Sequence, residues 1–143
     1  FNGGIIFFLF KGSDGLEHGL IVALTESTAQ WQSSATLVNA NRTEDGAFNT
    51  ALMTNSPAAT YIAGLGAGWY LPSTDELVLL YNNRYSVQKA LRAGGSTLLS
   101  NTAYYWSSTE YNATGACGVH FNGGFATNLY KTNTGTVRGV RAF

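Results

Sequence analysis

The sequence predicts an α+β domain from three observations: an apolar run near the N-terminus, helix-capping signals in the middle, and short β-like runs from residue 100 onward. The chain has 143 residues, 45% of them hydrophobic, which is enough to bury one core. It contains neither an internal repeat nor a linker-like segment. We therefore expect a single domain over residues 1–143.

An N-terminal hairpin is the first element that the sequence predicts. Glycines precede the apolar run Ile5–Phe10, the turn Gly12–Gly15 follows it, and residues 18–24 form the partner strand. The run is about a third of the roughly twenty residues that a membrane-spanning helix needs. We expect it to be a buried strand, without direct membrane insertion. It also lacks the basic flank of a signal peptide, and the start at Phe1 indicates that upstream segments are missing.

Two short helices are predicted next. After a polar stretch, Phe48, Ala51 and Leu52 stand at helical spacing and indicate the first. Ser56 followed by Pro57 is typical of an N-cap and a first-turn proline, which open the second helix. The glycines at positions 64, 66 and 68 end it.

The clearest helix start lies at Ser73. Glu76 follows three residues later and completes a capping box, with acidic side chains at the positive end of the helix dipole. The apolar stripe of this helix comprises Leu77, Leu80 and Tyr81. A shorter helix over residues 86–92 ends at two glycines, Gly94 and Gly95.

The remainder of the chain is predicted to be an antiparallel sheet. Its β-like runs cover residues 104–108, 119–121, 125–127 and 137–143, separated by Gly, Asn and Thr turns. Strands at both ends of the chain suggest that the two termini pair in one sheet. We therefore expect Phe143 to be held in place by pairing.

Composition excludes several classes of partner. Charged residues make up 11% of the chain and cancel to a net charge of zero, so nucleic acid and anionic membranes are not expected to bind. The polar surface consists of Asn, Thr, Ser, Gly and Tyr, which are typical of adaptable binding loops.

Motifs for catalysis or cofactor binding are weak. Two isolated His, one Cys and scattered acids do not form a metal-ligand set, and no phosphate-binding loop follows a strand, so we expect neither metal nor cofactor. Cys117 and His120 lie three residues apart and suggest an activated thiolate, but we favour an unreactive cysteine. The three tryptophans suggest a sugar-stacking platform, but we favour core anchors; they are Trp31, Trp69 and Trp106.

Four blocks of sequence span almost the whole chain: Gly3–Phe7, Trp69–Leu77, Tyr105–Tyr111 and Val137–Phe143. Together, and in this order, they resemble the Lcl C-terminal-like domain family. The resemblance implies a C-type-lectin-like fold of the formylglycine-generating-enzyme subtype, in the C-terminal domain of a longer protein. It implies an extracellular location, on a bacterial surface or a phage particle. The calcium-dependent sugar motifs of C-type lectins and the paired cysteines of formylglycine-generating enzymes are absent.

The family includes variable proteins of diversity-generating retroelements, in which adenine-directed mutagenesis rewrites a C-terminal segment. The affected codons do not encode Lys, Glu, Gln, Met or Trp. Between Ala113 and Thr136 the only residue of these types is Lys131. The resemblance therefore implies that this segment is diversified.

Comparison with the family's Asn-rich pattern separates a framework from candidate ligand-facing positions. The expected framework consists of Phe121, Gly124, Lys131, Val137, Arg138, Val140, Arg141 and Phe143. The candidate ligand-binding residues are Thr114, Gly115, Cys117, Gly118, His120, Phe125, Thr127, Leu129, Tyr130 and Thr132.

Three functions follow as hypotheses. The first is non-enzymatic recognition of a protein or glycan by a displayed variable domain. The second is a structural or adhesin-like cell-surface domain without diversification. The third is an enzyme that uses Cys117 or a carboxylate, which the absence of a recognisable catalytic set disfavours.

Overall fold

The structure of the chain, a computed structural model, describes residues 1–143 and contains eight strands and four helices. The strands are β1 (Gly4–Lys11), β2 (Glu17–Ala23), β3 (Ser27–Gln30), β4 (Tyr104–Glu110), β5 (Gly115–His120), β6 (Phe125–Tyr130), β7 (Thr134–Val137) and β8 (Val140–Ala142). The helices are α1 (Gly46–Leu52), α2 (Pro57–Ala63), α3 (Thr74–Asn82) and α4 (Arg84–Ala93). The predicted α+β class is confirmed.

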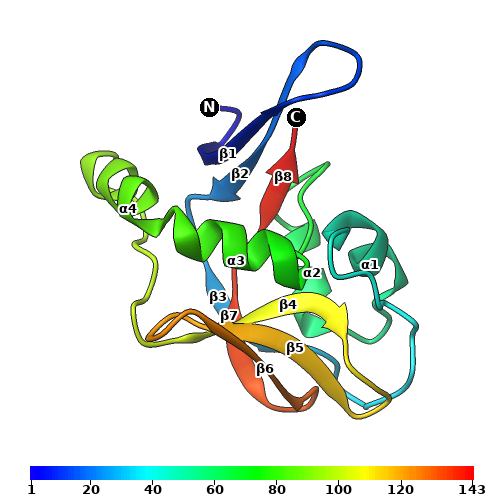
Figure 1. Ribbon diagram of the computed structural model, residues 1–143. Coiled ribbons are helices and arrows are strands. Elements are labelled where there is room, and N and C mark those ends of the chain that lie inside the picture. The colour runs from blue at the N-terminus through cyan, green and yellow to red at the C-terminus, as the bar shows by residue number, and fades with distance from the viewer.

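The strands form two sheets with helix α3 between them (Figure 1). The first sheet is antiparallel in the order β1-β2-β8, and the second has the order β3-β7-β4-β5-β6. Only β4 and β7 pair in parallel. Both termini lie at the end formed by the first sheet, and the β5–β6 hairpin lies at the opposite end (Figure 1).

Pairing of the two chain ends is confirmed. Strand β8 lies against β2, with Val140 opposite Val22. The backbones of Gly19 and Phe143 exchange two hydrogen bonds of 3.1 Å, so the last residue is held in the first sheet.

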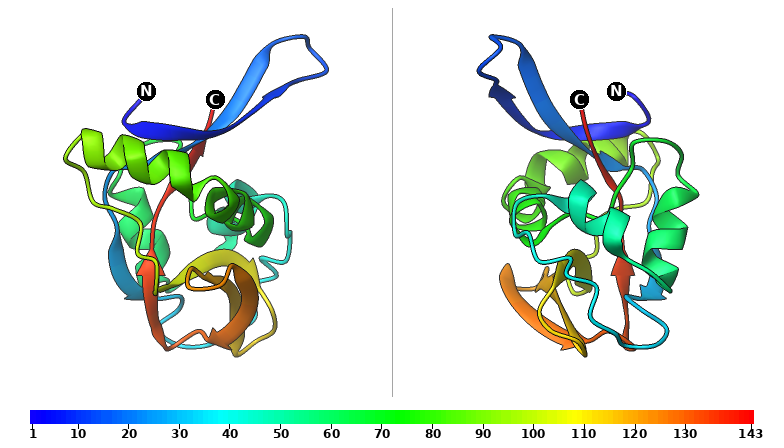
Figure 2. Two further views of the ribbon diagram at one scale, coloured as in Figure 1. Left: turned by 60° about the vertical axis from the view of Figure 1, so that its left-hand side comes forward. Right: turned by 90° about the vertical axis from the view of Figure 1, so that its right-hand side faces the viewer.

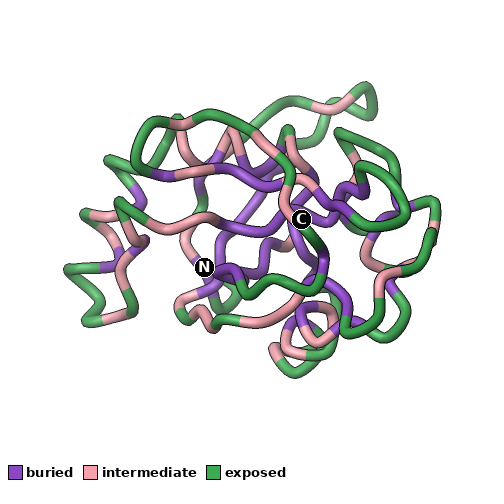
Figure 3. Tube along the Cα trace, turned by 90° about the horizontal axis from the view of Figure 1, so that it is seen from below, coloured by how far each residue is buried: buried purple, intermediate pink, exposed green.

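The core consists of two apolar clusters. One joins the first sheet to α3 and α4 through residues such as Phe7, Leu77 and Leu91. The other surrounds Trp31 and Trp106, which are both fully buried. Figure 3 shows these buried stretches through the centre of the molecule and exposed segments around the rim. Trp31 and Trp106 are core anchors, as expected, whereas Trp69 is only half-buried.

The predicted helix starts are confirmed at both caps. The Ser56 hydroxyl accepts from the backbone N–H of Ala59, and Pro57 opens α2. At α3 the capping box is complete, because Ser73 accepts from the N–H of Glu76 while the Glu76 carboxylate accepts from the N–H of Ser73.

The predicted N-terminal strand and its hairpin are confirmed, but the strand is only partly buried: Phe7 is 6% exposed. Leu9 and Phe10 are 48% and 49% exposed. The reason is that β1 is the edge of its sheet, and the tip of the β1–β2 hairpin projects beyond the body (Figure 2). Apolar composition alone does not distinguish a central strand from an overhanging one.

Three further elements differ from the sequence interpretation. The first predicted helix is confirmed as α1, but Phe48 lies at the surface beneath the Arg42 guanidinium, and the buried residues are Gly46 and Asn49. Strand β3 lies in a stretch that was read only as polar. The run 137–143 is divided, because β7 ends at Val137 and β8 begins at Val140 in the other sheet.

Candidate functional site

The β5–β6 hairpin carries most of the candidate ligand-binding residues. Its register pairs Gly115 with Tyr130 and His120 with Phe125. Side chains alternate between the two faces of a strand, and directly paired residues share a face. The candidates are therefore divided between two faces of the hairpin and do not form one surface.

The first face carries a row of three aromatic rings across three strands. His120 lies between Tyr104 on β4 and Phe125 on β6, with ring centroids 4.9 Å and 4.8 Å apart. The Tyr104 contact is edge-to-face and the Phe125 contact is stacked. Phe125 is 53% exposed at the outer end of the row, because its own strand, β6, is the edge of the sheet.

The second face, which carries Gly115 and Tyr130, borders a hollow at the open end of the hairpin, beside the β4–β5 turn. The Asn112 carboxamide oxygen accepts hydrogen bonds from the N–H groups of Thr114 and Gly115, at 2.9 Å and 2.8 Å, and so fixes the β4–β5 turn. Tyr130 is 68% exposed. The hollow is lined by Asn112, Thr114, Gly115, Asn128, Leu129 and Tyr130.

The ten candidates differ in how much of each side chain reaches solvent. Four are exposed: Thr114, Phe125, Tyr130 and Thr132. Four are half-buried: Cys117, His120, Thr127 and Leu129. His120 was expected to be exposed, and its position between two rings corrects that expectation.

The two candidate glycines are buried, although Gly115 lines the hollow through its backbone. A side chain at Gly118 would overlap the Tyr104 ring, because a Cβ there would lie 2.5 Å from its Cζ atom. Gly118 therefore provides space for the aromatic row. Gly115 contributes its backbone N–H to the turn at Asn112.

Cys117 lies on the face of β5 opposite His120, near Thr74 of α3. Burial raises the pKa of its thiol, against a weaker lowering effect of the Thr74 hydroxyl. The thiol thus remains protonated at neutral pH, and the imidazole does not lie beside it.

A buried ion pair anchors the end of the hairpin. The Lys131 ammonium lies 2.5 Å from the Glu110 carboxylate and also donates to the Thr36 carbonyl at 2.6 Å. The same carboxylate accepts from the N–H groups of Val38 and Asn39. Lys131 was predicted to be framework, and its side chain is fully buried.

A second buried cation joins the two sheets. Arg138 is 1% exposed and donates to the Ala23 carbonyl, the Thr97 carbonyl and the Glu26 carboxylate. Glu26 also accepts a 2.8 Å hydrogen bond from the Tyr105 hydroxyl. Of the other framework residues, Phe121, Val137 and Val140 are buried, whereas Gly124, Arg141 and Phe143 are half-buried.

The profile of the Lcl C-terminal domain family matches residues 21–141. The chain belongs to this family. The Lcl C-terminal domain is also similar to the crystal structure of a fimbrial protein from Bacteroides ovatus, with a TM-score of 0.72 and 21% identity. The match covers 91% of this chain and 37% of the fimbrial protein, so the chain spans little more than a third of that neighbour's length. A comparison with curated proteins found no match.

Two features of this Lcl C-terminal domain concern metals and membranes. No three His, Cys, Asp or Glu residues are grouped closely enough to hold a metal ion. None of its helices combines the length and the apolar character that crossing a bilayer requires.

Sequence reasoning missed three residues of the candidate site, because Asn112 also lines the hollow. Tyr104 precedes the segment assigned as variable, yet it begins the aromatic row. Asn128 matches the family's Asn-rich pattern and was passed over, yet it lines the hollow with Tyr130. Strand alternation was the signal that could have found Tyr104 and Asn128, since the first pairs with His120 and the second is two residues from Tyr130.

Proposed function

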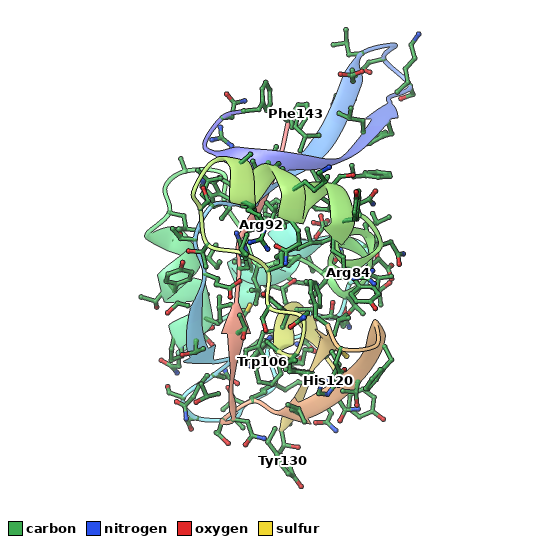
Figure 4. The ribbon with its side chains drawn as sticks, turned by 90° about the vertical axis from the view of Figure 1, so that its left-hand side faces the viewer. Arg84, Arg92, Trp106, His120, Tyr130 and Phe143 are labelled. Atoms are coloured by element: carbon green, nitrogen blue, oxygen red, sulfur yellow. The ribbon has the colours of Figure 1, made fainter.

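We propose that this Lcl C-terminal domain is a non-enzymatic recognition module whose β5–β6 hairpin binds a protein or glycan. The observation that carries the proposal is the position of the exposed aromatic side chains. Tyr130 lies at the end of the molecule opposite Phe143 (Figure 4), and Phe125 is exposed at the other end of the same strand, β6. Exposed aromatic rings are common anchors of binding energy in interfaces.

A rigid support beneath the hairpin favours recognition by side chains over recognition by a mobile loop. Lys131 follows β6 directly, and its buried ion pair with Glu110 links that end of the hairpin to the end of β4. Contact residues on a fixed scaffold lose little conformational entropy on binding. The framework and the exposed positions are thus distinct sets of residues.

The finer parts of the proposal concern fold subtype, diversification and location. We assign a C-type-lectin-like fold, which the pairing of β8 with β2 near the two termini supports.

Diversification by a retroelement is supported by the identity and the burial of Lys131. It is the one residue between Ala113 and Thr136 that the mutated codons do not encode, and it is buried away from the hollow. Such a domain acts at a bacterial surface or on a phage particle, without nucleic acid, metal or cofactor.

The proposal that the domain is not an enzyme is supported by its only thiol. Cys117 is half-buried, its pKa is raised by burial, and it lies on the other face of β5 from His120. A nucleophilic cysteine needs the opposite shift, toward the thiolate.

An adhesin-like surface domain without diversification is the second candidate. The observation that favours it is the similarity to the fimbrial protein, whose chain contains this fold as one part of a longer molecule. Fold similarity at 21% identity does not identify a ligand. The two candidate functions are therefore distinguished by experiment.

Binding is tested with a glycan array and with intact bacterial and epithelial cells in flow cytometry. The fluorescent parent chain is compared with a Phe125→Ser/Tyr130→Ser variant and with a Tyr85→Ser control, because Tyr85 is 73% exposed on α4. We expect the parent and the control to bind the same targets, and the double variant to lose them. Equal binding by the double variant, or no target for the parent, overturns the proposal.

Diversification is tested on the DNA around the gene. A near-identical repeat of the segment that differs at adenines, next to a reverse transcriptase gene, supports the first candidate. Absence of both leaves the adhesin-like domain.

A further inference from the structure

A second concave site lies at the other end of the molecule, beneath the overhanging β1–β2 hairpin. An open pocket of about 320 Å³ lies between residues of this hairpin and residues of α3. That volume lies at the lower end of the range for small-molecule sites, about 300–1,000 Å³. None of the residues of the β5–β6 hairpin lines it.

Aromatic rings form much of the pocket wall. Phe8 and Phe10 come from β1, with ring centroids 5.7 Å apart, and Phe143 follows β8. Tyr70 contributes its ring from the segment before α3. Phe10 is 49% exposed, and its ring also stacks against His18, with centroids 5.6 Å apart.

The charged groups of the pocket are acidic. Glu44 is exposed at the rim, and Glu76 lies at the floor, where it accepts from the Tyr70 hydroxyl at 2.8 Å. Neither Lys nor Arg lines the pocket. His18 is the remaining titratable side chain, and its ring lies 2.9 Å from the Asp14 carboxylate, which balances any positive charge on it.

We propose that this pocket binds an organic ammonium cation, with Phe8, Phe10 and Tyr70 supplying aromatic faces and Glu44 and Glu76 supplying negative charge. Aromatic faces attract quaternary and methylated ammonium groups through the ring quadrupole, and such groups fill apolar pockets that a hydrated ion does not enter. The two carboxylates supply charge complementarity that a neutral apolar ligand does not use.

The pocket chemistry disfavours the other small ligands. An anion would face Glu44 and Glu76 without a compensating cation. A small inorganic cation would need several oxygen ligands, and the pocket offers two carboxylates within a mostly aromatic wall. An ammonium with attached methyl groups contacts the aromatic wall and is attracted by the two carboxylates.

The test uses choline and its uncharged isostere 3,3-dimethylbutan-1-ol in NMR titrations of the folded chain. We expect choline to bind with a Kd on the order of 1 mM and to shift the amides of Phe8, Leu20 and Glu44. The isostere should bind at least about tenfold more weakly, because it lacks the charge. Amides of the β5–β6 hairpin should not shift, which keeps the result independent of ligand recognition at that hairpin.

Two variants assign the contributions of ring and charge. Phe10→Leu keeps an apolar side chain but removes the ring, and we expect it to weaken choline binding about fivefold. Glu44→Gln removes the rim charge, and we expect about threefold weaker binding. Tyr85→Leu and Glu17→Gln are the matched controls, because both residues are exposed outside this pocket.

Equal affinity for choline and the neutral isostere overturns the assignment, because the pocket is then merely apolar. Unchanged choline affinity in both Phe10→Leu and Glu44→Gln overturns it as well. Melting temperatures of the four variants show whether each remains folded at the titration temperature.

Discussion

The Lys131 ammonium and the Glu110 carboxylate lie 2.5 Å apart with side chains that are 0% and 3% exposed. The pair joins the end of β6 to the end of β4, and it is completed by hydrogen bonds to backbone groups of residues 36–39. A buried pair of this kind contributes little net stability when intact, but removal of one partner leaves a buried charge. The pair is therefore a sensitive point of the framework.

We predict that Lys131→Met lowers the free energy of unfolding by about 3–5 kcal/mol, because it leaves the Glu110 carboxylate uncompensated. Urea denaturation measured by circular dichroism gives the value. Lys89→Met is the matched control, because Lys89 is exposed on α4, and its effect should stay within about 0.5 kcal/mol. A small effect of Lys131→Met would contradict the description of the pair as a sensitive point of the framework.

The N-cap of α3 gives a second prediction. Ser73→Ala removes the acceptor of the Glu76 N–H and should lower the free energy of unfolding by about 1 kcal/mol. The comparison is Ser86→Ala on the exposed face of α4, where no cap is lost. Chemical denaturation of both variants checks the prediction, and equal midpoints would show that the cap is not stabilising.

Glu76 gives a prediction about pH. Burial raises the pKa of this carboxyl above its ordinary value of 4.5, although hydrogen bonds from Ser73 and Tyr70 oppose the shift. The folded state therefore holds the proton more tightly than the unfolded state does. Its contribution to stability is fully present below pH 4.5 and is lost as the pH rises through the raised value.

Denaturation of the parent and Glu76→Gln at a series of pH values isolates this effect. Between pH 4.5 and the raised pKa, the parent should lose stability relative to Glu76→Gln as the pH rises. Asp45→Asn is a control for which we expect the opposite dependence of stability on pH. The Phe48 N–H holds the pKa of Asp45 below its usual range, so that contribution is lost as the pH falls. A pH-independent difference between the parent and Glu76→Gln contradicts the prediction.

Local signals predicted the helices well because capping chemistry acts over three or four residues. Ser73 with Glu76, and Ser56 with Pro57, specify helix starts without reference to the rest of the chain. The burial of Asn49 was not predictable in this way. Its carboxamide bonds the peptide groups of Arg42, a partner that only the folded loop brings close.

The sheets depended on contacts that are distant in sequence. Strand β3 has no apolar alternation and forms by pairing with β7, about a hundred residues later. Most of the candidate residues were placed on one hairpin, but their division between two faces follows from the register that pairs His120 with Phe125. Tyr104 was missed because it lies on a neighbouring strand outside the segment that the resemblance marked as variable.

The last prediction separates the scaffold from the surface. Trp106 is fully buried, and its indole N–H donates to the Ala29 carbonyl at 3.1 Å, so Trp106→Ala should cost about 3–5 kcal/mol of stability. Tyr130→Ala should stay within about 0.5 kcal/mol of the parent, because the side chain is 68% exposed. His120→Ala should fall between them, at about 1 kcal/mol, since it removes two ring contacts in the row.

Thermal melting and ligand titration of these variants, together with Phe125→Ala, distinguish the two sets of residues. For a target found by array or cell binding, Tyr130→Ala or Phe125→Ala should weaken binding by about 2 kcal/mol if that ring is an anchor. Trp106→Leu serves as the comparison, because it alters the core with less loss of volume. If Tyr130→Ala unfolds the chain while Trp106→Ala melts like the parent, the framework and the binding face have been assigned the wrong way round.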